Sequence, residues 1–148
     1  MNSLEMVSQN KILTTALVCW IIAQILKGLV TFWVEKRINF KRFVQAGGMP
    51  SSHSALMAGL TFSCGFQEGW TAPITAVAIV VSLIVMYDAA GVRRAAGKQA
   101  AILNKVIDEL FAKGYFAENR LIEFLGHTPV EVFTGALLGL LVAFLVYY

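Results

Sequence analysis

The sequence predicts an all-α integral membrane protein, a single domain over residues 1–148 with about four transmembrane helices and one amphipathic surface helix. Of the 148 residues, 57% are hydrophobic and only 14% are charged, against roughly 25% charged in a typical soluble domain. The charged residues also avoid four long stretches, each close to the ~20 residues that cross a bilayer. Residues 43–67, 69–87 and 132–148 contain no Asp, Glu, Lys or Arg, and residues 12–34 contain only Lys27.

The first half of the chain predicts two spans joined by a basic loop. Span one covers about residues 12–33, with Trp33 near an interface, where amphipathic rings are favoured. The loop of residues 34–49 contains Gly47 and Gly48 just before its last residue, Met49. Span two covers about residues 50–69, and Ser51 or Ser52 can cap its first turn. This span is rich in Gly, Ser and Thr, so we expect its neighbours to enclose it in part.

The second half predicts two further spans separated by a polar segment. Span three covers residues 71–86, and span four runs from about residue 129 to 148. Between them, residues 98–116 place apolar side chains at helical spacing among polar ones, which predicts an amphipathic helix on the membrane surface. These side chains are Leu103, Val106, Ile107, Leu110 and Phe111.

The basic residues predict the orientation in the plasma membrane. The loop of residues 34–49 holds four Lys or Arg and the segment 91–127 holds six, and such loops stay in the cytoplasm. The end of span one, the start of span two, the end of span three and the start of span four would then meet at the cytoplasmic face. The net charge of +3 comes from residues at the ends of apolar segments, so nucleic acid is not an expected partner. Two cysteines in apolar stretches, Cys19 and Cys64, are read as small hydrophobic residues.

A histidine lies at the start of span two. Ser51, Ser52 and His53 follow Gly47, Gly48 and Pro50, and a helix N-terminus attracts phosphate oxygens through its unpaired N–H groups and its dipole. The alternative interpretation is a serine-capped helix with an incidental histidine.

The other histidine lies just before span four. His127 precedes Thr128, Pro129 and Glu131, and two interpretations of Glu131 are open. Thr128 and Glu131 can form a capping box, or Glu131 can accept a hydrogen bond from one ring nitrogen of His127 and aim the other at an electrophile. Gly135 and Gly139 follow on the same helix face, where they would allow close packing.

These two segments resemble motifs of the type 2 phosphatidic acid phosphatase and vanadium haloperoxidase superfamily, above all its divergent branch of small membrane proteins. Residues 50–53 resemble its Pro-Ser-Gly-His motif, and residues 126–132 resemble its His-x-x-x-Asp motif. The resemblance implies a phosphatase-like domain that uses no metal or other cofactor. It implies that His127 is the nucleophile, that Glu131 orients it, and that His53 protonates the leaving oxygen.

The basic residues that would clamp the phosphoryl group match the superfamily less well. No Arg-Pro is present, Glu131 replaces an Asp, and the position of the expected arginine, six residues before His127, is Leu121, next to Arg120. We expect Ser51, Ser52, Lys27, Arg93, Arg94 and Lys98 to bind substrate. Membrane anchoring explains either arginine, taken singly, equally well. Snorkelling is the alternative for Lys27, whose inward direction the resemblance favours. Asp88 could pair with Arg93 or Lys98. The remaining basic candidates are Lys36, Arg37, Lys41 and Arg42.

Two functions fit these residues. The first is hydrolysis of a lipid phosphate monoester or pyrophosphate at the cytoplasmic face, with membrane lipids as partners. The second is a catalytically silent protein that binds anionic headgroups or supports transport. A four-span bundle is thin, which is compatible with a homodimer.

Overall fold

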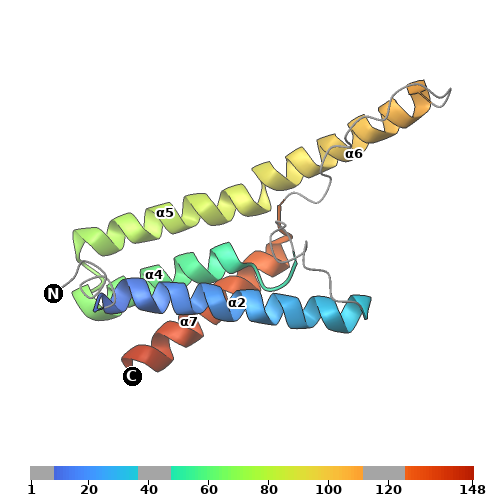
Figure 1. Ribbon diagram of the computed structural model, residues 1–148. Coiled ribbons are helices and arrows are strands. Elements are labelled where there is room, and N and C mark those ends of the chain that lie inside the picture. Colours follow the sequence, from blue (N-terminus) through green and yellow to red (C-terminus); the bar gives the residue numbers. More distant parts are fainter. Residues whose placement is uncertain (1–8, 37–47, 112–125) are drawn as a thin grey trace.

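The computed structural model describes residues 9–36, 48–111 and 126–148, and the ordered elements in these ranges are helices. They are α2 (Lys11–Glu35), α4 (Ser52–Glu68), α5 (Pro73–Ala90), α6 (Val92–Phe111) and α7 (Pro129–Tyr147) (Figure 1). The all-α class is therefore confirmed.

Local capping explains where three of these helices begin. The side chain of Asn10 accepts a hydrogen bond from the Leu13 N–H at the start of α2. Ser51 caps α4 in the same way, and Thr128 caps α7, whose first residue is a proline. Proline suits this position because its fixed φ is helical and its missing N–H would have no partner there.

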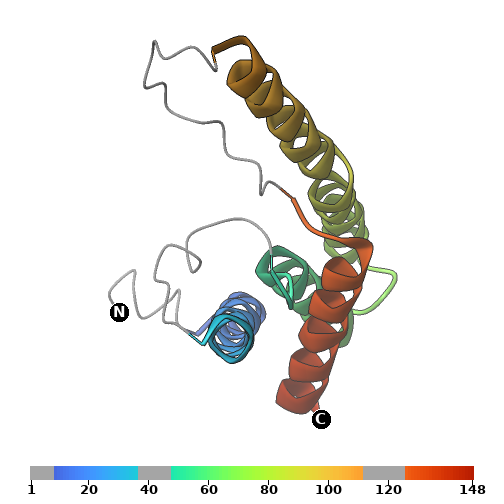
Figure 2. The ribbon, with the colours of Figure 1, turned by 90° about the vertical axis from the view of Figure 1, so that its right-hand side faces the viewer.

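Helix α4 lies at the centre of the bundle, in contact with α2, α5 and α7 (Figure 2). Helices α2 and α5 run in one direction, and α4 and α7 run in the other (Figure 1). The C-terminal ends of α2 and α5 therefore lie at the same end of the bundle as the N-terminal ends of α4 and α7. The alternation of spans predicts this arrangement.

Small residues allow the central helices to approach closely. A Cβ atom on Gly139 would collide with the backbone of α4 at Ala55 and Gly59, and one on Gly59 would collide with Cys19 of α2. Small interfacial residues of this kind are typical of helices packed in membranes. The buried apolar residues here are mostly small ones: Ala16, Cys19, Ala23, Ala55, Ala58 and Ala143.

Three stretches of the described chain are long and apolar enough to cross a membrane, where the sequence predicts four. They are Lys11–Trp33, Pro73–Ile107 and Pro129–Tyr147. Helix α4 has 17 residues, or about 26 Å at 1.5 Å per residue, which is shorter than the ~30 Å hydrocarbon layer. Its many small and polar residues are covered by neighbouring helices, as expected for span two.

The segment after span three differs from the expectation. Helix α5 continues to Ala90, and α6 starts at Val92 rather than at residue 98 and extends the direction of α5 (Figures 1 and 2). The Gly91 N–H bonds to the Tyr87 carbonyl, and the Ala95 N–H bonds to the Gly91 carbonyl. These two bonds keep helical spacing on both sides of Gly91, the residue that separates the two helices. Leu103 and Val106 of the predicted apolar face are exposed, and residues 112–116 lie outside the described ranges.

Candidate functional site

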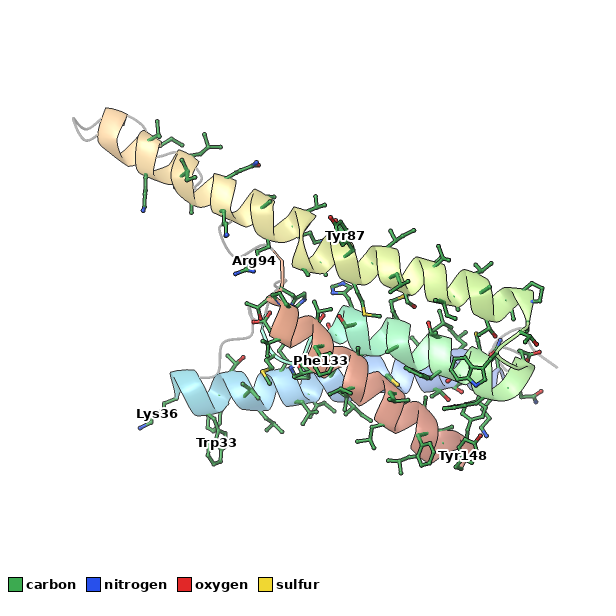
Figure 3. The ribbon with its side chains drawn as sticks, turned by 180° about the vertical axis from the view of Figure 1, so that it is seen from behind. Trp33, Lys36, Tyr87, Arg94, Phe133 and Tyr148 are labelled. Carbon is green, nitrogen blue, oxygen red and sulfur yellow. The ribbon has the colours of Figure 1, made fainter. Side chains whose placement is uncertain are left out.

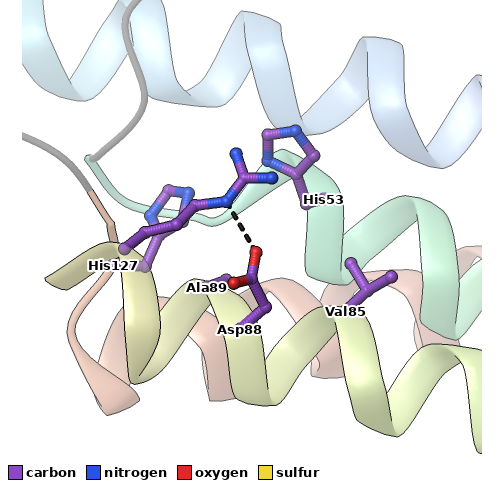
Figure 4. Close-up of a pocket in the computed structure, with 6 residues that line it drawn as sticks. His53, Val85, Asp88, Ala89 and His127 are labelled. Atoms are coloured by element: carbon purple, nitrogen blue, oxygen red, sulfur yellow. Dashed lines mark hydrogen bonds and ion pairs between the residues drawn. The ribbon is translucent and has the colours of Figure 1, made fainter. Parts of the chain in front are cut away.

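The two histidines of the sequence meet at the end of the bundle. The ring centroids of His53 and His127 are 6.2 Å apart, and the rings are inclined by 63°. They line a small pocket with Val85, Asp88, Ala89 and Arg93 (Figure 4). The pocket thus joins the first turn of α4, the junction of α5 and α6, and the residues before α7.

A carboxylate holds the ring of His127. Only 3% of His127 is exposed, and its Nδ1 lies 3.0 Å from Oε2 of Glu131. Because an ionised carboxylate only accepts hydrogen bonds, this contact requires a proton on Nδ1, and in the neutral ring the lone pair is then on Nε2. This is the arrangement that a nucleophilic imidazole needs.

The same carboxylate oxygen also caps α7. Oε2 of Glu131 accepts a hydrogen bond from the Thr128 N–H at 3.1 Å, and the Thr128 hydroxyl accepts one from the Glu131 N–H at 3.3 Å. A complete capping box is therefore present together with the contact to His127. The two interpretations of Glu131 describe one arrangement.

Backbone contacts fix the position of His127 and of the two helix starts. The His127 N–H bonds to the Ala89 carbonyl at 2.9 Å, and the Ser51 N–H bonds to the Glu131 carbonyl at 3.0 Å. Gly126 has φ +92° and packs against the backbone of Arg93 and Arg94, where a Cβ atom would not fit. Sequence reasoning missed Ala89, because a backbone acceptor leaves no side-chain signature. Gly126 could have been identified from the sequence, because glycine is the usual residue where the backbone needs a positive φ.

Of the predicted cations on α6, Arg93 reaches the pocket. Its Nε lies 2.7 Å from Oδ2 of Asp88, which identifies Arg93 rather than Lys98 as the partner of this acid. Arg94 and Lys98 are exposed and are not among the residues that line the pocket.

Lys27 points inward rather than to an interface. It is 5% exposed, and its side chain packs against Gly48 (φ +90°) in the segment that leads into α4. Its positive charge is among those that lower the pKa of His53.

The two serines are buried, and the contacts of Ser51 are structural. The Ser51 hydroxyl oxygen accepts hydrogen bonds from the N–H and the hydroxyl of Ser54, so its side chain caps α4 as predicted. Neither Ser51 nor Ser52 lines the pocket. The expected binding of substrate by their hydroxyls is therefore not seen in this geometry.

The environment of His53 disfavours its charged form. Burial lowers the pKa of His53 from its ordinary value of 6.5, and repulsion from His127 when it is protonated, and from Arg93 and Lys27, lowers it further. An anion bound near His53 would favour its charged form, although the Asp88 carboxylate already lines the pocket and pairs with Arg93.

The other basic candidates lie elsewhere. Lys36 is exposed at the C-terminal end of α2, near Trp33, and points away from the other helices (Figure 3). Arg37, Lys41, Arg42, Arg120 and Leu121 lie outside the described residues. Within the described ranges, no three His, Cys, Asp or Glu side chains are grouped so as to hold a metal ion.

Long apolar helices around a small-residue helix, with two histidines at one end, define a helical membrane protein with a two-histidine site. The chain belongs to the Divergent PAP2 family, which matches residues 8–142. It is 35% identical over 147 residues to the "Uncharacterized membrane protein YuiD" of Bacillus subtilis (strain 168), covering 92% of this chain and 93% of that protein. No solved structure matches the chain.

Proposed function

We propose that the protein is a metal-independent lipid phosphatase that works through a phosphohistidine. The observation that carries the proposal is the meeting of His53 and His127 across one pocket, with Glu131 on Nδ1 of His127. The ring centroids are 6.2 Å apart, whereas in-line transfer places an attack distance of about 3–3.5 Å, a P–O bond and a charge-assisted hydrogen bond of about 2.7–2.9 Å between the two reacting nitrogens. The pocket between the rings is small, so the proposal requires the two side chains to move apart when a phosphoryl group binds.

The first step transfers the phosphoryl group to His127. Nε2 of His127 forms a bond to phosphorus while the bond from phosphorus to the leaving oxygen breaks. His53 gives its proton to that oxygen. The imidazole then carries a positive charge, which the Glu131 carboxylate stabilises through Nδ1–H.

The second step releases inorganic phosphate. Water attacks phosphorus, the bond to Nε2 breaks, and neutral His53 takes the proton of the water. His127 returns to its neutral form, so the reaction needs no co-reactant other than water.

Arg93 and Lys27 supply the positive charge that the phosphoryl oxygens require. Arg93 lines the pocket, and its planar fork suits two oxygens at once. Lys27 is buried beside the segment that leads to His53. Substrate phosphate would compete with Asp88 for Arg93.

A lipid substrate and a cytoplasmic site are part of the proposal. The pocket lies where four helix ends meet, which is the headgroup level if α4 forms a fourth, enclosed crossing. The basic segments favour a cytoplasmic position for this end. Cysteines introduced by Lys98→Cys and Glu68→Cys test this, because an impermeant reagent should label position 68 alone in intact cells. Labelling of position 98 alone would show that the orientation is the opposite one.

A silent headgroup-binding protein is the second candidate, and Asp88 favours it. The Asp88 carboxylate lines the pocket and occupies Arg93, so a substrate must displace an anion. Phosphate release from purified protein, tested on monoester and pyrophosphate lipids, decides between the two. Turnover that is lost in His127→Ala supports the enzyme, and headgroup binding without turnover supports the silent protein.

A further inference from the structure

An apolar groove runs along α4 between α2 and α5. These two helices flank α4 but do not contact each other in the described part of the chain. The floor of the groove includes Leu60 and Cys64 of α4, and its walls include Leu13 of α2 and Val77 and Val81 of α5. Its volume is about 390 Å³, within the range of about 300–1,000 Å³ of small-molecule sites.

The groove lies further along the same two helices as the histidine pocket, and the two share no lining residue. Val81 in the groove lies one helical turn from Val85, which lines the pocket with His53. Leu60 and Cys64 follow His53 by seven and eleven residues, or about 10 and 16 Å along α4 at 1.5 Å per residue. A chain attached to a phosphate between the histidines would therefore reach the groove by running along α4.

The size of the groove favours a thin occupant. One turn of an α-helix, about 10 Å wide and 5.4 Å long, takes about 400 Å³, which is the whole of this volume. A whole helix of a second copy is therefore too large to enter the groove and could place only side chains in it, whereas a single acyl chain is thin enough to lie along it. Val77 and Val81 are 56% and 43% exposed, so the groove is open to the surrounding lipid.

We infer that this groove binds the acyl chain of the lipid whose phosphate lies between His53 and His127. The inference deepens the proposed function and rests on it. It assigns the substrate to phosphorylated lipids with a long chain, in preference to short-chain or water-soluble phosphates. The chain in the groove would hold the phosphate in register with the histidines.

Filling the groove tests the inference through substrate choice. Val77→Trp places a large side chain in the groove, whereas Leu83→Trp, on the same helix at a position 62% exposed and outside the groove lining, is its control. With dioleoyl phosphatidic acid, we expect kcat/KM to fall at least 10-fold in Val77→Trp, by the scale of misfitted apolar pockets. With dihexanoyl phosphatidic acid, kcat/KM should stay within twofold. An equal loss on both substrates, or no loss on either, would overturn the inference. Val81→Phe replaces Val77→Trp if that variant does not fold.

Cross-linking tests the groove without turnover. The probe is a phosphatidic acid with a mid-chain diazirine, presented to His127→Ala protein in phosphatidylcholine vesicles. We expect adducts on α4 and α5 around Leu60, Cys64 and Val81, lost in the Val77→Trp background and kept in the Leu83→Trp background. Adducts spread over the exposed faces of α5 and α7, or a dimer lost in Val77→Trp while the adducts persist, would contradict the inference. Groove adducts in a protein without phosphatase activity would support binding of an acyl chain in the groove and refute the proposed function.

Discussion

One carboxylate oxygen, Oε2 of Glu131, lies 3.0 Å from Nδ1 of His127 and 3.1 Å from the Thr128 N–H. The residue that completes the capping box of α7 is therefore the residue that sets the tautomer of His127. A substitution at Glu131 disturbs helix stability and imidazole chemistry together. The two effects separate only with variants that keep one and remove the other.

Glu131→Gln and Thr128→Ala make this separation. Glutamine still accepts a hydrogen bond from the Thr128 N–H but cannot stabilise an imidazolium by charge. We expect near-normal thermal stability with turnover lower by about 10²-fold or more, on the scale of lost acid-base groups. Thr128→Ala should instead cost about 1 kcal/mol of stability, typical of a lost cap, and keep most of the turnover. Full activity in Glu131→Gln would reduce Glu131 to a helix cap.

The pKa of His53 predicts the pH dependence. Because burial, and repulsion from His127 when protonated and from Arg93 and Lys27, lower this pKa below 6.5, the protonated fraction of His53 rises only as the pH falls through the lowered value. The step that needs a protonated acid should therefore be fastest on the acid side of pH 6.5 and slow as the pH rises.

Nuclear magnetic resonance can follow this titration directly, because the sequence contains two histidines. Arg93→Gln removes one of the positive charges, so the pKa of His53 should rise toward 6.5. Arg94→Gln is the matched control and should leave it unchanged, since Arg94 is not among the charges that act on His53. Identical titration of His53 in Arg93→Gln and in the unmodified protein would contradict the assigned geometry of the pocket.

Close packing of α7 on α4 should be needed for the site. In Gly135→Ala the new Cβ would meet the Ser51 carbonyl, next to the hydrogen bond that joins the two helix starts. We expect a loss of about 1–3 kcal/mol, typical of overpacking, and lower turnover because His53 is displaced from His127. Leu137→Ala, at a position 48% exposed, should change both far less. Thermal unfolding and phosphate release measure the two effects, and an unaffected Gly135→Ala protein would show that this contact does not position the site.

Metal independence is a further expectation. Two imidazoles and fixed cations would supply the nucleophile, the acid and the charge that a metal otherwise supplies. Phosphate release should persist in excess chelator and be inhibited by vanadate. The phosphohistidine mechanism would be contradicted if chelator abolished the activity and only Mg²⁺ or Zn²⁺ restored it.

The sequence predicts the helices and their alternation well, because long uncharged stretches and helix-capping residues leave clear local patterns. It also predicts that His53, His127 and Glu131 lie at one end of the bundle, since successive spans cross the membrane in opposite directions. It leaves the inward direction of Lys27 open, because a snorkelling and a buried lysine share the same spacing. The sequence also leaves open whether Ser51 binds substrate or caps the helix. In the structure, the N–H and the hydroxyl of Ser54 donate hydrogen bonds to the Ser51 hydroxyl oxygen, which gives Ser51 the capping role.

The junction of α5 and α6 shows a different limit. A glycine between an apolar span and a polar amphipathic segment predicts a helix end, and α5 does end next to Gly91. The sequence does not predict that α6 begins directly after this glycine, with helical hydrogen bonds made by Gly91 and Ala95. Here Asp88 pairs with Arg93 across this glycine, which ties the last turn of α5 to the first turn of α6.

The central claim is that His127 is the nucleophile, and trapping of the phosphoenzyme tests it most directly. Purified protein is mixed with a lipid carrying a ³²P-labelled phosphate, quenched in alkali, which preserves phosphohistidine, and mapped by peptide. We predict a label on His127 in the unmodified protein, a label that forms more slowly in His53→Ala, and none in His127→Ala. Turnover without a label on His127, or a label that persists in His127→Ala, would contradict the account.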